Sequence, residues 1–326
     1  MGATQARFGI KSEHEQNMMD QKSKQKIFTV VGSTSDIGKA VAGRLSALGH
    51  TVRKVSRTEG VSIDNTEALQ KAFQEVDGAY LVIPFDVQAP DLHAREDQIG
   101  KKLAGVVAAA RVRRVVFLSS LSAHLTKSTT STGAAMMEKR LLKLGVPELM
   151  ILRCGFFMEN FLRGMNFIQQ IPSGFFVSSF KGDIPMPMIA CKDVAEKIAE
   201  FMTAAHLPEK RVQELLGARD YTFVEATRIM GKTLGHPEFA YREVPVDEAQ
   251  EAMLAAGVSP SFADAVMKTA KSFNARDQWS LEKRSPQNTT ATTLEEWSKD
   301  VLPKVFEEPT ASAKKREHTQ QQKIRA

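Results

Sequence analysis

Residues Ile27 to Gly38 read IFTVVGSTSDIG, and this stretch decides the fold. The first five residues are apolar or β-branched, which is typical of a strand covered on both faces. Gly32 and Gly38 bracket a short loop, and the apolar periodicity of a helix follows. A strand, a glycine-containing turn and a helix in this order predict the first unit of a parallel α/β sheet.

The same alternation continues along the chain. Strands separated by helices of ten or more residues require right-handed crossovers, so we expect a doubly wound parallel sheet of the Rossmann type. The predicted strands are 27–31, 51–55, 79–83, 114–120 and 148–153, and the predicted helices are 37–48, 67–75, 92–110 and 136–144.

The pattern loosens after Arg153. Residues 156–180 are rich in Phe and Met and are interrupted by Gly and Pro. We therefore expect a Rossmann core at 27–155 and a smaller, mainly helical substrate lobe at 156–306, partly intertwined with the core. Within the lobe, helices are predicted at 193–205, 222–234, 247–256 and 294–306, and short strands at 212–217 and 239–244.

Both ends of the chain are polar. Residues 1–26 and 307–326 lack the apolar surface that would offset the entropy of ordering, and they are predicted to be a disordered leader and a disordered tail. Each end holds five basic and three acidic side chains, so the two ends carry four of the six net positive charges. The basic balance therefore predicts solvated tails, and we expect no nucleic-acid partner.

The amino-acid composition narrows the class of protein further. The chain is 42% hydrophobic and 25% charged, which is ordinary for a globular protein. Its two cysteines, Cys154 and Cys191, form no metal-ligand pattern, so we expect no disulfide framework, no metal and a cytoplasmic location. No apolar run of about 18 residues occurs, so no membrane span is expected.

The loop after the first strand is suited to a dinucleotide. Pyrophosphate binding needs a tight turn from strand to helix and a helix N-terminus whose free amides face the anion. Gly32 suits the turn and Gly38 suits close packing, whereas Ser35 replaces the usual middle glycine and offers a hydroxyl to phosphate. The predicted contacts are Gly32, Ser33, Thr34, Ser35, Asp36, Ile37 and Gly38.

The end of the second predicted strand indicates which dinucleotide binds. An acidic residue there would favour the ribose hydroxyls of NAD, but residues 39–58 contain none. Ser56 and Arg57 lie where a 2′-phosphate is expected, and a guanidinium binds phosphate through paired hydrogen bonds. We therefore predict NADP(H), with a solvated arginine as the alternative and nearby Glu59 as an opposing charge.

Several segments together resemble the NmrA-like atypical short-chain dehydrogenase/reductases over roughly residues 27–306. They are the glycine loop, DGAYLVIP at 77–84, VVFLSS at 115–120, IACKDV at 189–194 and, most specifically, LRCGFFMEN at 152–160. The resemblance implies a Rossmann core. It also implies cofactor contacts from Arg57, Pro84, Ser119 and Ser120, and a nicotinamide end lined by residues 155–160, with Gly155 and Phe156 touching the cofactor.

The chain departs from the related pattern at three places. Ser35 stands for a glycine, and Ser62 occupies the position of the usual adenine-seating Asp, with Asp64 as a possible substitute. The Tyr-x-x-x-Lys pair of ordinary short-chain dehydrogenases is missing, because Pro84, Glu225 and Pro245 lie four positions after the three tyrosines. The usual proton donor for carbonyl reduction is therefore absent.

Other side chains remain for chemistry. Ser120 ends the predicted strand 114–120 and His124 follows it, at the edge where an open sheet exposes its ligand crevice. These two residues are the catalytic candidates. His124 can equally be a solvated histidine, and Ser120 and Ser122 can equally cap the next helix. Phe157, Met158 and Asn160 are predicted to line the substrate pocket, although apolar residues in this region can simply form core.

Two functions fit these features. The first is an NADPH-dependent oxidoreductase that transfers hydride to a small conjugated or aromatic acceptor, such as a quinone, an imine or an enone. Such acceptors need little acid assistance, so binding geometry and a dry pocket can suffice. The alternative is an NADP(H)-sensing regulator of the NmrA type, without turnover and with a protein partner.

Overall fold

The computed structural model describes residues 25–125 and 128–306, so the predicted disordered segments lie outside the described residues, except for residues 25 and 26. A six-stranded sheet has the order β2-β1-β3-β4-β5-β9, and every pair of neighbours in it is parallel. Its strands are β1 (Ile27–Val31), β2 (Thr51–Val55), β3 (Gly78–Leu81), β4 (Arg114–Ser120), β5 (Glu148–Cys154) and β9 (Val212–Leu215). The predicted Rossmann-type sheet is confirmed.

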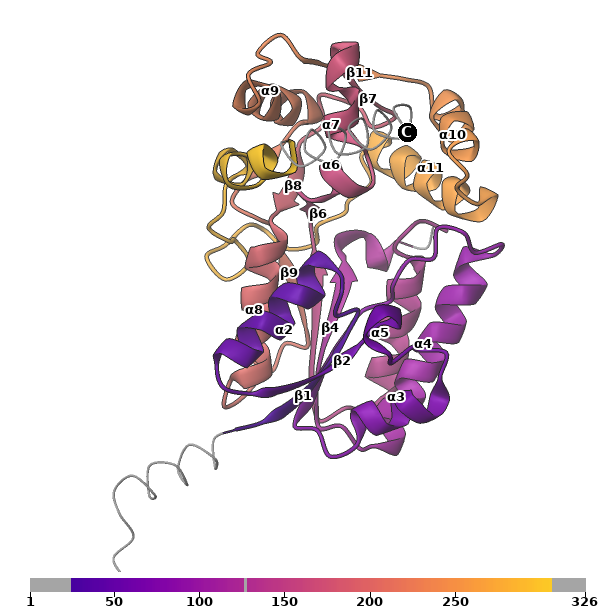
Figure 1. Ribbon diagram of the computed structural model, residues 1–326, viewed down its shortest axis with the longest axis vertical. Helices are drawn as coiled ribbons and strands as arrows, with labels where there is room; N and C mark the ends of the chain where they lie inside the picture. The colour runs from indigo at the N-terminus through magenta and orange to yellow at the C-terminus, as the bar shows by residue number, and fades with distance from the viewer. Residues whose placement is uncertain (1–24, 126–127, 307–326) are drawn as a thin grey trace, which may run out of the picture.

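Helices cover both faces of this sheet (Figure 1). One face carries α2 (Asp36–Ala47) and α8 (Cys191–Thr203), and the other carries α3 (Thr66–Phe73), α4 (Leu92–Ala109) and α5 (Thr132–Leu144). Alternate residues of β1 supply the two cores: Phe28 and Val30 pack toward α2 and α8, whereas Val31 packs toward the other helices. This alternation is the period of two that a strand imposes.

The order of the strands creates a crevice. From β1 the chain moves outward to β2, whereas β3 lies on the other side of β1 and leads on to β4. Loops leaving adjacent strands in opposite directions open a gap at the carboxyl ends of β1 and β3, where ligands of such sheets bind. The glycine loop follows β1 directly, so the predicted loop lies at this switch point.

A second lobe covers the carboxyl edge of the sheet (Figure 1). Its core is aromatic, with Phe161, Phe167, Phe223 and Trp297 buried together. It contains the sheets β10-β8-β6 and β11-β7. The elements are β6 (Phe156–Phe157), α6 (Asn160–Arg163), α7 (Phe167–Gln170), β7 (Phe175–Ser178), β8 (Met186–Ile189), β10 (Asp220–Tyr221), α9 (Phe223–Thr233), β11 (Ala240–Glu243), α10 (Val246–Ala255) and α11 (Pro260–Asn274), followed by helical residues 294–306.

The short elements between residues 156 and 189 and strand β10 add to the predicted set, and two larger features differ from the sequence-based expectation. Residues 191–215, assigned to the lobe, return to the core, where α8 covers the sheet and β9 pairs with β5. Helix α11 is absent from the predicted set, although Ser259 caps it by accepting from the amide of Phe262 and Pro260 begins it. Across the described part of the chain, no helix is both long and apolar enough to span a membrane.

Candidate functional site

The glycine loop forms the turn that was predicted between β1 and α2. Gly32 has a φ of +70°, which favours glycine, and its amide bonds to the carbonyl of Val55 at 2.9 Å, tying the loop to the end of β2. A Cβ on Gly38 would lie 2.1 Å from the Gly32 carbonyl oxygen. The loop therefore has no room for a side chain at Gly38, and helix and strand meet through backbone alone.

Ser35 has a different role from the phosphate contact considered above. Its side chain accepts from the Gly38 amide at 3.0 Å and donates to the Gly32 carbonyl at 2.8 Å, so it is the N-cap of α2. The amides of Asp36 and Ile37, in the first turn, have no intrahelical acceptor. Together with the helix dipole they form a cradle that fits a pyrophosphate.

Opposite charges meet at the end of β2. Glu59 accepts a hydrogen bond from buried Ser33 in the glycine loop and pairs with Lys54 at 3.1 Å. The bond from Ser33, followed by the contact with Lys54, lowers the pKa of Glu59, so its carboxylate is charged at neutral pH. Ser56 and Arg57 lie beside this carboxylate, and the Arg57 side chain is exposed.

The proposed substitute for an adenine-seating acid already has partners. Asp64 accepts from Lys102 at 2.7 Å and forms two bonds with Arg95, and these contacts lower the pKa of Asp64. Ser62 accepts from the backbone amide of Asp64. Since cations of α4 hold the Asp64 carboxylate, its availability to an adenine stays a prediction.

Ser119 points into a buried charge network that sequence inspection missed. Its hydroxyl donates to Glu138 of α5 at 2.5 Å, and Arg153 of β5 donates to both oxygens of the same carboxylate, at 2.9 and 2.6 Å. Glu138 is the main cause of the raised pKa of Arg153. The network ties β4, β5 and α5 together beneath the crevice, so any cofactor contact from Ser119 would use its backbone.

The next residue belongs to a cluster of hydroxyls at the carboxyl end of β4. Ser131 donates to Ser120 at 2.8 Å and lies 2.5 Å from Ser122. The two oxygens of Ser120 and Ser122 are 3.3 Å apart. None of these side chains caps the helix that follows it, so they bond to one another instead. Ser120 keeps partial exposure, and its catalytic role stays a prediction.

His124 joins the core to the lobe. Its Nδ1 lies 2.9 Å from the carbonyl of Leu121, and its Nε2 lies 2.9 Å from the carbonyl of Gln278 in the lobe. Both ring nitrogens thus face backbone acceptors rather than open space. This geometry is that of a positioning residue, and proton donation by His124 stays a prediction.

The three tyrosines are held elsewhere. Tyr80 is fully buried in the core under α2 and α8. Tyr221 donates to Glu295 at 2.9 Å, and Tyr241 donates to the carbonyl of Phe180. Helix α5 carries no tyrosine at all. Among the described residues, therefore, no phenol is presented at the crevice.

The segment GFFMEN passes from β5 into the lobe. A Cβ on Gly155 would lie 2.6 Å from the Pro187 carbonyl oxygen, so this glycine allows two backbones to meet. Phe156 and Phe157 are half-buried and stay candidates for the cofactor and the pocket. Met158 is fully buried in the lobe core. This side chain packs within the lobe, and its part in a substrate pocket stays a prediction.

The two polar residues of this segment behave differently from each other. Glu159 accepts from the Cys191 amide at 3.0 Å and from the Trp297 indole at 2.9 Å, so it joins α8 to the last helix. Asn160 begins α6, and its partly exposed carboxamide has no partner among the residues that the structure describes. Asn160 is thus free to meet a ligand.

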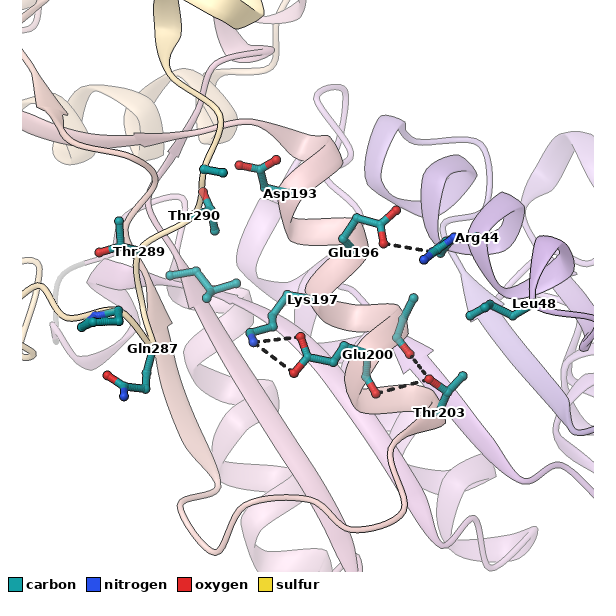
Figure 2. Close-up of a pocket in the computed structure, with 14 residues that line it drawn as sticks. Arg44, Leu48, Asp193, Glu196, Lys197, Glu200, Thr203, Gln287, Thr289 and Thr290 are labelled. Atoms are coloured by element: carbon teal, nitrogen blue, oxygen red, sulfur yellow. Dashed lines mark hydrogen bonds and ion pairs between the residues drawn. The ribbon is translucent and has the colours of Figure 1, made fainter. Parts of the chain in front are cut away.

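A cavity of about 570 Å³ lies away from these residues. It lies between α8 and the segment 286–291, with Arg44 of α2 and Leu48, which follows that helix, at its side (Figure 2). Its walls hold ion pairs, such as Arg44 with Glu196 at 3.0 Å. None of the predicted cofactor or pocket residues lines it. Such a charged groove does not suit an apolar ring, so we place the candidate site at the crevice.

The fold and the loop define a Rossmann-type α/β protein whose second lobe covers the ligand edge of the sheet. The chain belongs to the NmrA-like family, whose model matches residues 23–298. The resemblance noted in the sequence is therefore confirmed.

Two curated relatives are oxidoreductases by name. The (4-alkanoyl-5-oxo-2,5-dihydrofuran-3-yl)methyl phosphate reductase of Streptomyces griseus is 28% identical, over 74% of this chain and 85% of that protein. The uncharacterized oxidoreductase YesF of Bacillus subtilis is 24% identical, over 75% of this chain and 84% of that protein.

Solved structures share the fold. The triphenylmethane reductase of Citrobacter sp. has a TM-score of 0.65 at 17% identity, covering 85% of this chain and 99% of that one. The quinone oxidoreductase QOR2 of Escherichia coli, complexed with NADPH, has a TM-score of 0.63 at 21% identity, with coverage of 85% and 99%. NmrA, a negative transcriptional regulator complexed with NAD, has a TM-score of 0.60 at 18% identity, with coverage of 88% and 98%.

Proposed function

We propose that the protein is an NADPH-dependent oxidoreductase that transfers hydride to a small conjugated or aromatic acceptor of the quinone, imine or enone type. The observation that carries the proposal is the cradle at the start of α2, where Gly38 admits no side chain and the first-turn amides are open. Such amides bind a pyrophosphate. The names of the two curated relatives support oxidoreduction.

The set of polar groups at the crevice favours an acceptor that needs little acid assistance. No tyrosine of the described chain reaches this place, whereas Ser120 has a partly exposed hydroxyl. Because Ser131 donates to Ser120, the hydrogen of Ser120 can be directed at an acceptor oxygen. The bound nicotinamide supplies the hydride, and the protein's part is to orient the acceptor and exclude water.

The apolar side of the crevice comes from the segment that enters the lobe. Phe156 and Phe157 are half-buried and offer ring surface, and Asn160 offers an unpaired carboxamide. These groups suit a flat ring that carries an oxygen or nitrogen. The Streptomyces griseus relative is named for a dihydrofuran ring with an oxo and an alkanoyl group, which agrees with this class. The cytoplasmic location expected from the sequence is part of this proposal.

The test is NADPH consumption with a panel of quinones, imines and enones, combined with calorimetry of NADPH binding. We expect turnover with at least one acceptor class. Arg57→Ala should raise the NADPH dissociation constant at least tenfold and change NADH little, because a charge-assisted phosphate bond is lost. Equal losses for both coenzymes would remove Arg57 from the proposal, and no turnover despite tight NADPH binding would refute the reductase.

That last outcome would favour a second candidate, an NADP(H)-sensing regulator that acts through a protein partner. The likeness to NmrA, a negative transcriptional regulator, and the missing tyrosine both support it. A regulator needs the same cradle but no acceptor pocket. The acceptor panel therefore separates the two functions directly.

A further inference from the structure

An ion pair crosses from the lobe to the glycine loop. Arg163 of α6 donates to both carboxylate oxygens of Asp36, with Nε–Oδ2 and Nη2–Oδ1 distances of 2.5 Å. Asp36 is the first residue of α2, so this carboxylate adjoins the open amides of the cradle. The two residues are 127 positions apart in the sequence, and only the fold brings them together.

A stabilising role accounts poorly for this pair. The Arg163 side chain is 71% exposed, and exposed ion pairs contribute little to stability. Asp36 at the first position of a helix is already favourably placed toward the helix dipole. The guanidinium also has five N–H donors, and the Nε–Nη2 edge alone serves Asp36. The other edge of the fork is left for a further acceptor.

We infer that Arg163 is a binding residue for the dinucleotide, whose pyrophosphate it contacts through the free edge of its guanidinium while Asp36 holds the other edge in place. This inference rests on the proposed function. A carboxylate lies within about 4 Å of its own amide nitrogen by covalent geometry alone, so Arg163 is close to the amides that receive the phosphates. The planar fork of arginine suits two phosphate oxygens.

Charge balance supports the same assignment. A pyrophosphate at the cradle would be repelled by the Asp36 carboxylate if that carboxylate were unpaired. Arg163 offsets Asp36 and adds a donor of its own on the lobe side, so the anion would be held from both sides. Asp36 is then a positioning residue, and Arg163 links dinucleotide binding to the lobe.

Calorimetry with two ligands tests the inference. NADPH and 2′-phospho-ADP-ribose share the pyrophosphate and the 2′-phosphate, but 2′-phospho-ADP-ribose lacks the nicotinamide. We expect Arg163→Ala to weaken both by a similar factor of about ten to a hundred, because a charged hydrogen bond is lost. Arg44→Ala is the matched control, since Arg44 also forms an exposed ion pair on α2, with Glu196 of α8, near the other end of the helix. Affinity should be unchanged in that control.

The double variant Asp36→Asn/Arg163→Ala separates a phosphate contact from simple neutralisation. We expect it to bind more tightly than Arg163→Ala, because the repulsion from Asp36 is removed, but to stay clearly weaker than the wild type, because the donor to the phosphates is still missing. Recovery of wild-type affinity would overturn the inference, because Arg163 would then only offset Asp36. Unchanged binding by Arg163→Ala, or a loss for NADPH alone, would also overturn it. Failure of the wild-type protein to bind either ligand would reject the proposed function itself, and circular dichroism verifies that each variant is folded.

Discussion

At the scale of single residues, Glu59 is the side chain that opposes the predicted preference for NADP(H). Its carboxylate accepts from Ser33 and pairs with Lys54, so it lies against the glycine loop. Arg57 is two positions away and has an exposed guanidinium. A 2′-phosphate in this place would gain from the two cations and lose from the carboxylate. We therefore predict that the balance of these charges influences the choice between the coenzymes.

Replacing Glu59 with Gln should therefore tighten NADPH more than NADH. We expect a gain of about three- to tenfold for NADPH, because partly exposed charges interact weakly through water. Calorimetry with both coenzymes measures it. Glu67→Gln is the control, since the Glu67 carboxylate pairs with Lys71 on the exposed side of α3. An equal gain in affinity for NADH would show that Glu59 does not interact with the 2′-phosphate.

Gly38 is the residue whose replacement should damage the cradle most. In Gly38→Ala the new Cβ would lie 2.1 Å from the Gly32 carbonyl oxygen and 2.7 Å from its carbon, so backbone must move. We expect at least a tenfold loss of NADPH affinity and a lower thermal midpoint. Gly43→Ala, in the same helix, adds a Cβ with no atom within 4 Å and should stabilise the protein by about 0.5–1 kcal/mol. Similar behaviour of the two variants would contradict this account.

Burial of Glu96 makes the free energy of unfolding depend on pH. This residue of α4 is 1% exposed, and burial raises its pKa despite the contact with His93 at 2.9 Å. The folded state thus holds a proton that the unfolded state releases near the ordinary pKa of 4.5. The Glu96 contribution to the free energy of unfolding is therefore present below that pH and lost as pH rises through the raised pKa. Glu96→Gln should flatten this decline when urea unfolding is measured as the pH rises above 4.5, and an unchanged slope would refute the assignment.

At the scale of elements, Glu159 is the point where three segments meet. It stands between β6 and α6, accepts from the first amide of α8, and accepts from Trp297 in the last helix. The N-cap residue of α8, Ala190, has no side-chain acceptor of its own. Glu159 therefore supplies the missing cap from another part of the chain.

Replacing Glu159 with Gln should destabilise the protein. Gln keeps one acceptor oxygen where Glu has two, so one of the two donors is left buried and unpaired. We expect the free energy of unfolding to fall by about 1–3 kcal/mol in urea titration. Glu196→Gln on the exposed side of α8 should change it by less than about 0.5 kcal/mol. Equal effects of the two variants would argue against a cap at Glu159.

At the scale of the whole molecule, the lobe touches the core on both sides of the crevice. Besides the Asp36–Arg163 pair, the amide of Thr130 donates to Thr269 of α11 at 3.1 Å, and His124 faces the Gln278 carbonyl. A backbone hydrogen bond also joins the lobe to the core, because the amide of Ser259 donates to the Val87 carbonyl at 2.9 Å. We therefore predict that a ligand in the crevice would contact residues of the lobe as well as of the core.

Binding of NADPH should accordingly slow amide hydrogen exchange in both the core and the lobe. At a hundred times its dissociation constant, a ligand of the folded state adds about 2.7 kcal/mol to stability. We expect slower hydrogen exchange in the glycine loop and also at α6 and α11. Hydrogen exchange with mass detection, with and without NADPH, measures it. Protection confined to the residues of the parallel sheet and its helices would show that the lobe takes no part in binding.

The periodic elements were predictable because their signals are local. Strand β1 and helix α2 are recognisable from apolar periodicity and from Gly32, and the parallel order follows from helical crossovers. Helix α11 was not predicted, although Ser259 and Pro260 mark its start, because several of its buried residues are small or polar, such as Ala263 and Ser272, and give a weak apolar signal. The return of α8 and β9 to the core depends on pairing with β5, which no local pattern encodes.

The site was predictable only in part. The glycines of a turn from strand to helix are recognisable from their order in the sequence, as at Gly32 and Gly38. The partners of polar side chains are not, because residues far apart in sequence compete for the same groups. Ser35 is a helix cap, and Met158 is core. Glu138 and Arg163 were missed, since a buried acid and an exposed arginine look ordinary until their partners are known.

The sequence by itself determined the class of fold, the position of the glycine-containing turn and the absence of a Tyr-x-x-x-Lys pair, since each depends on neighbours along the chain. Only the tertiary structure decided which polar atoms remain available at the crevice. Ser119 is committed to Glu138, Glu159 to α8 and Asp36 to Arg163. The physical reason is that a buried or paired polar group takes the partner that the fold brings near it, whatever its distance along the sequence.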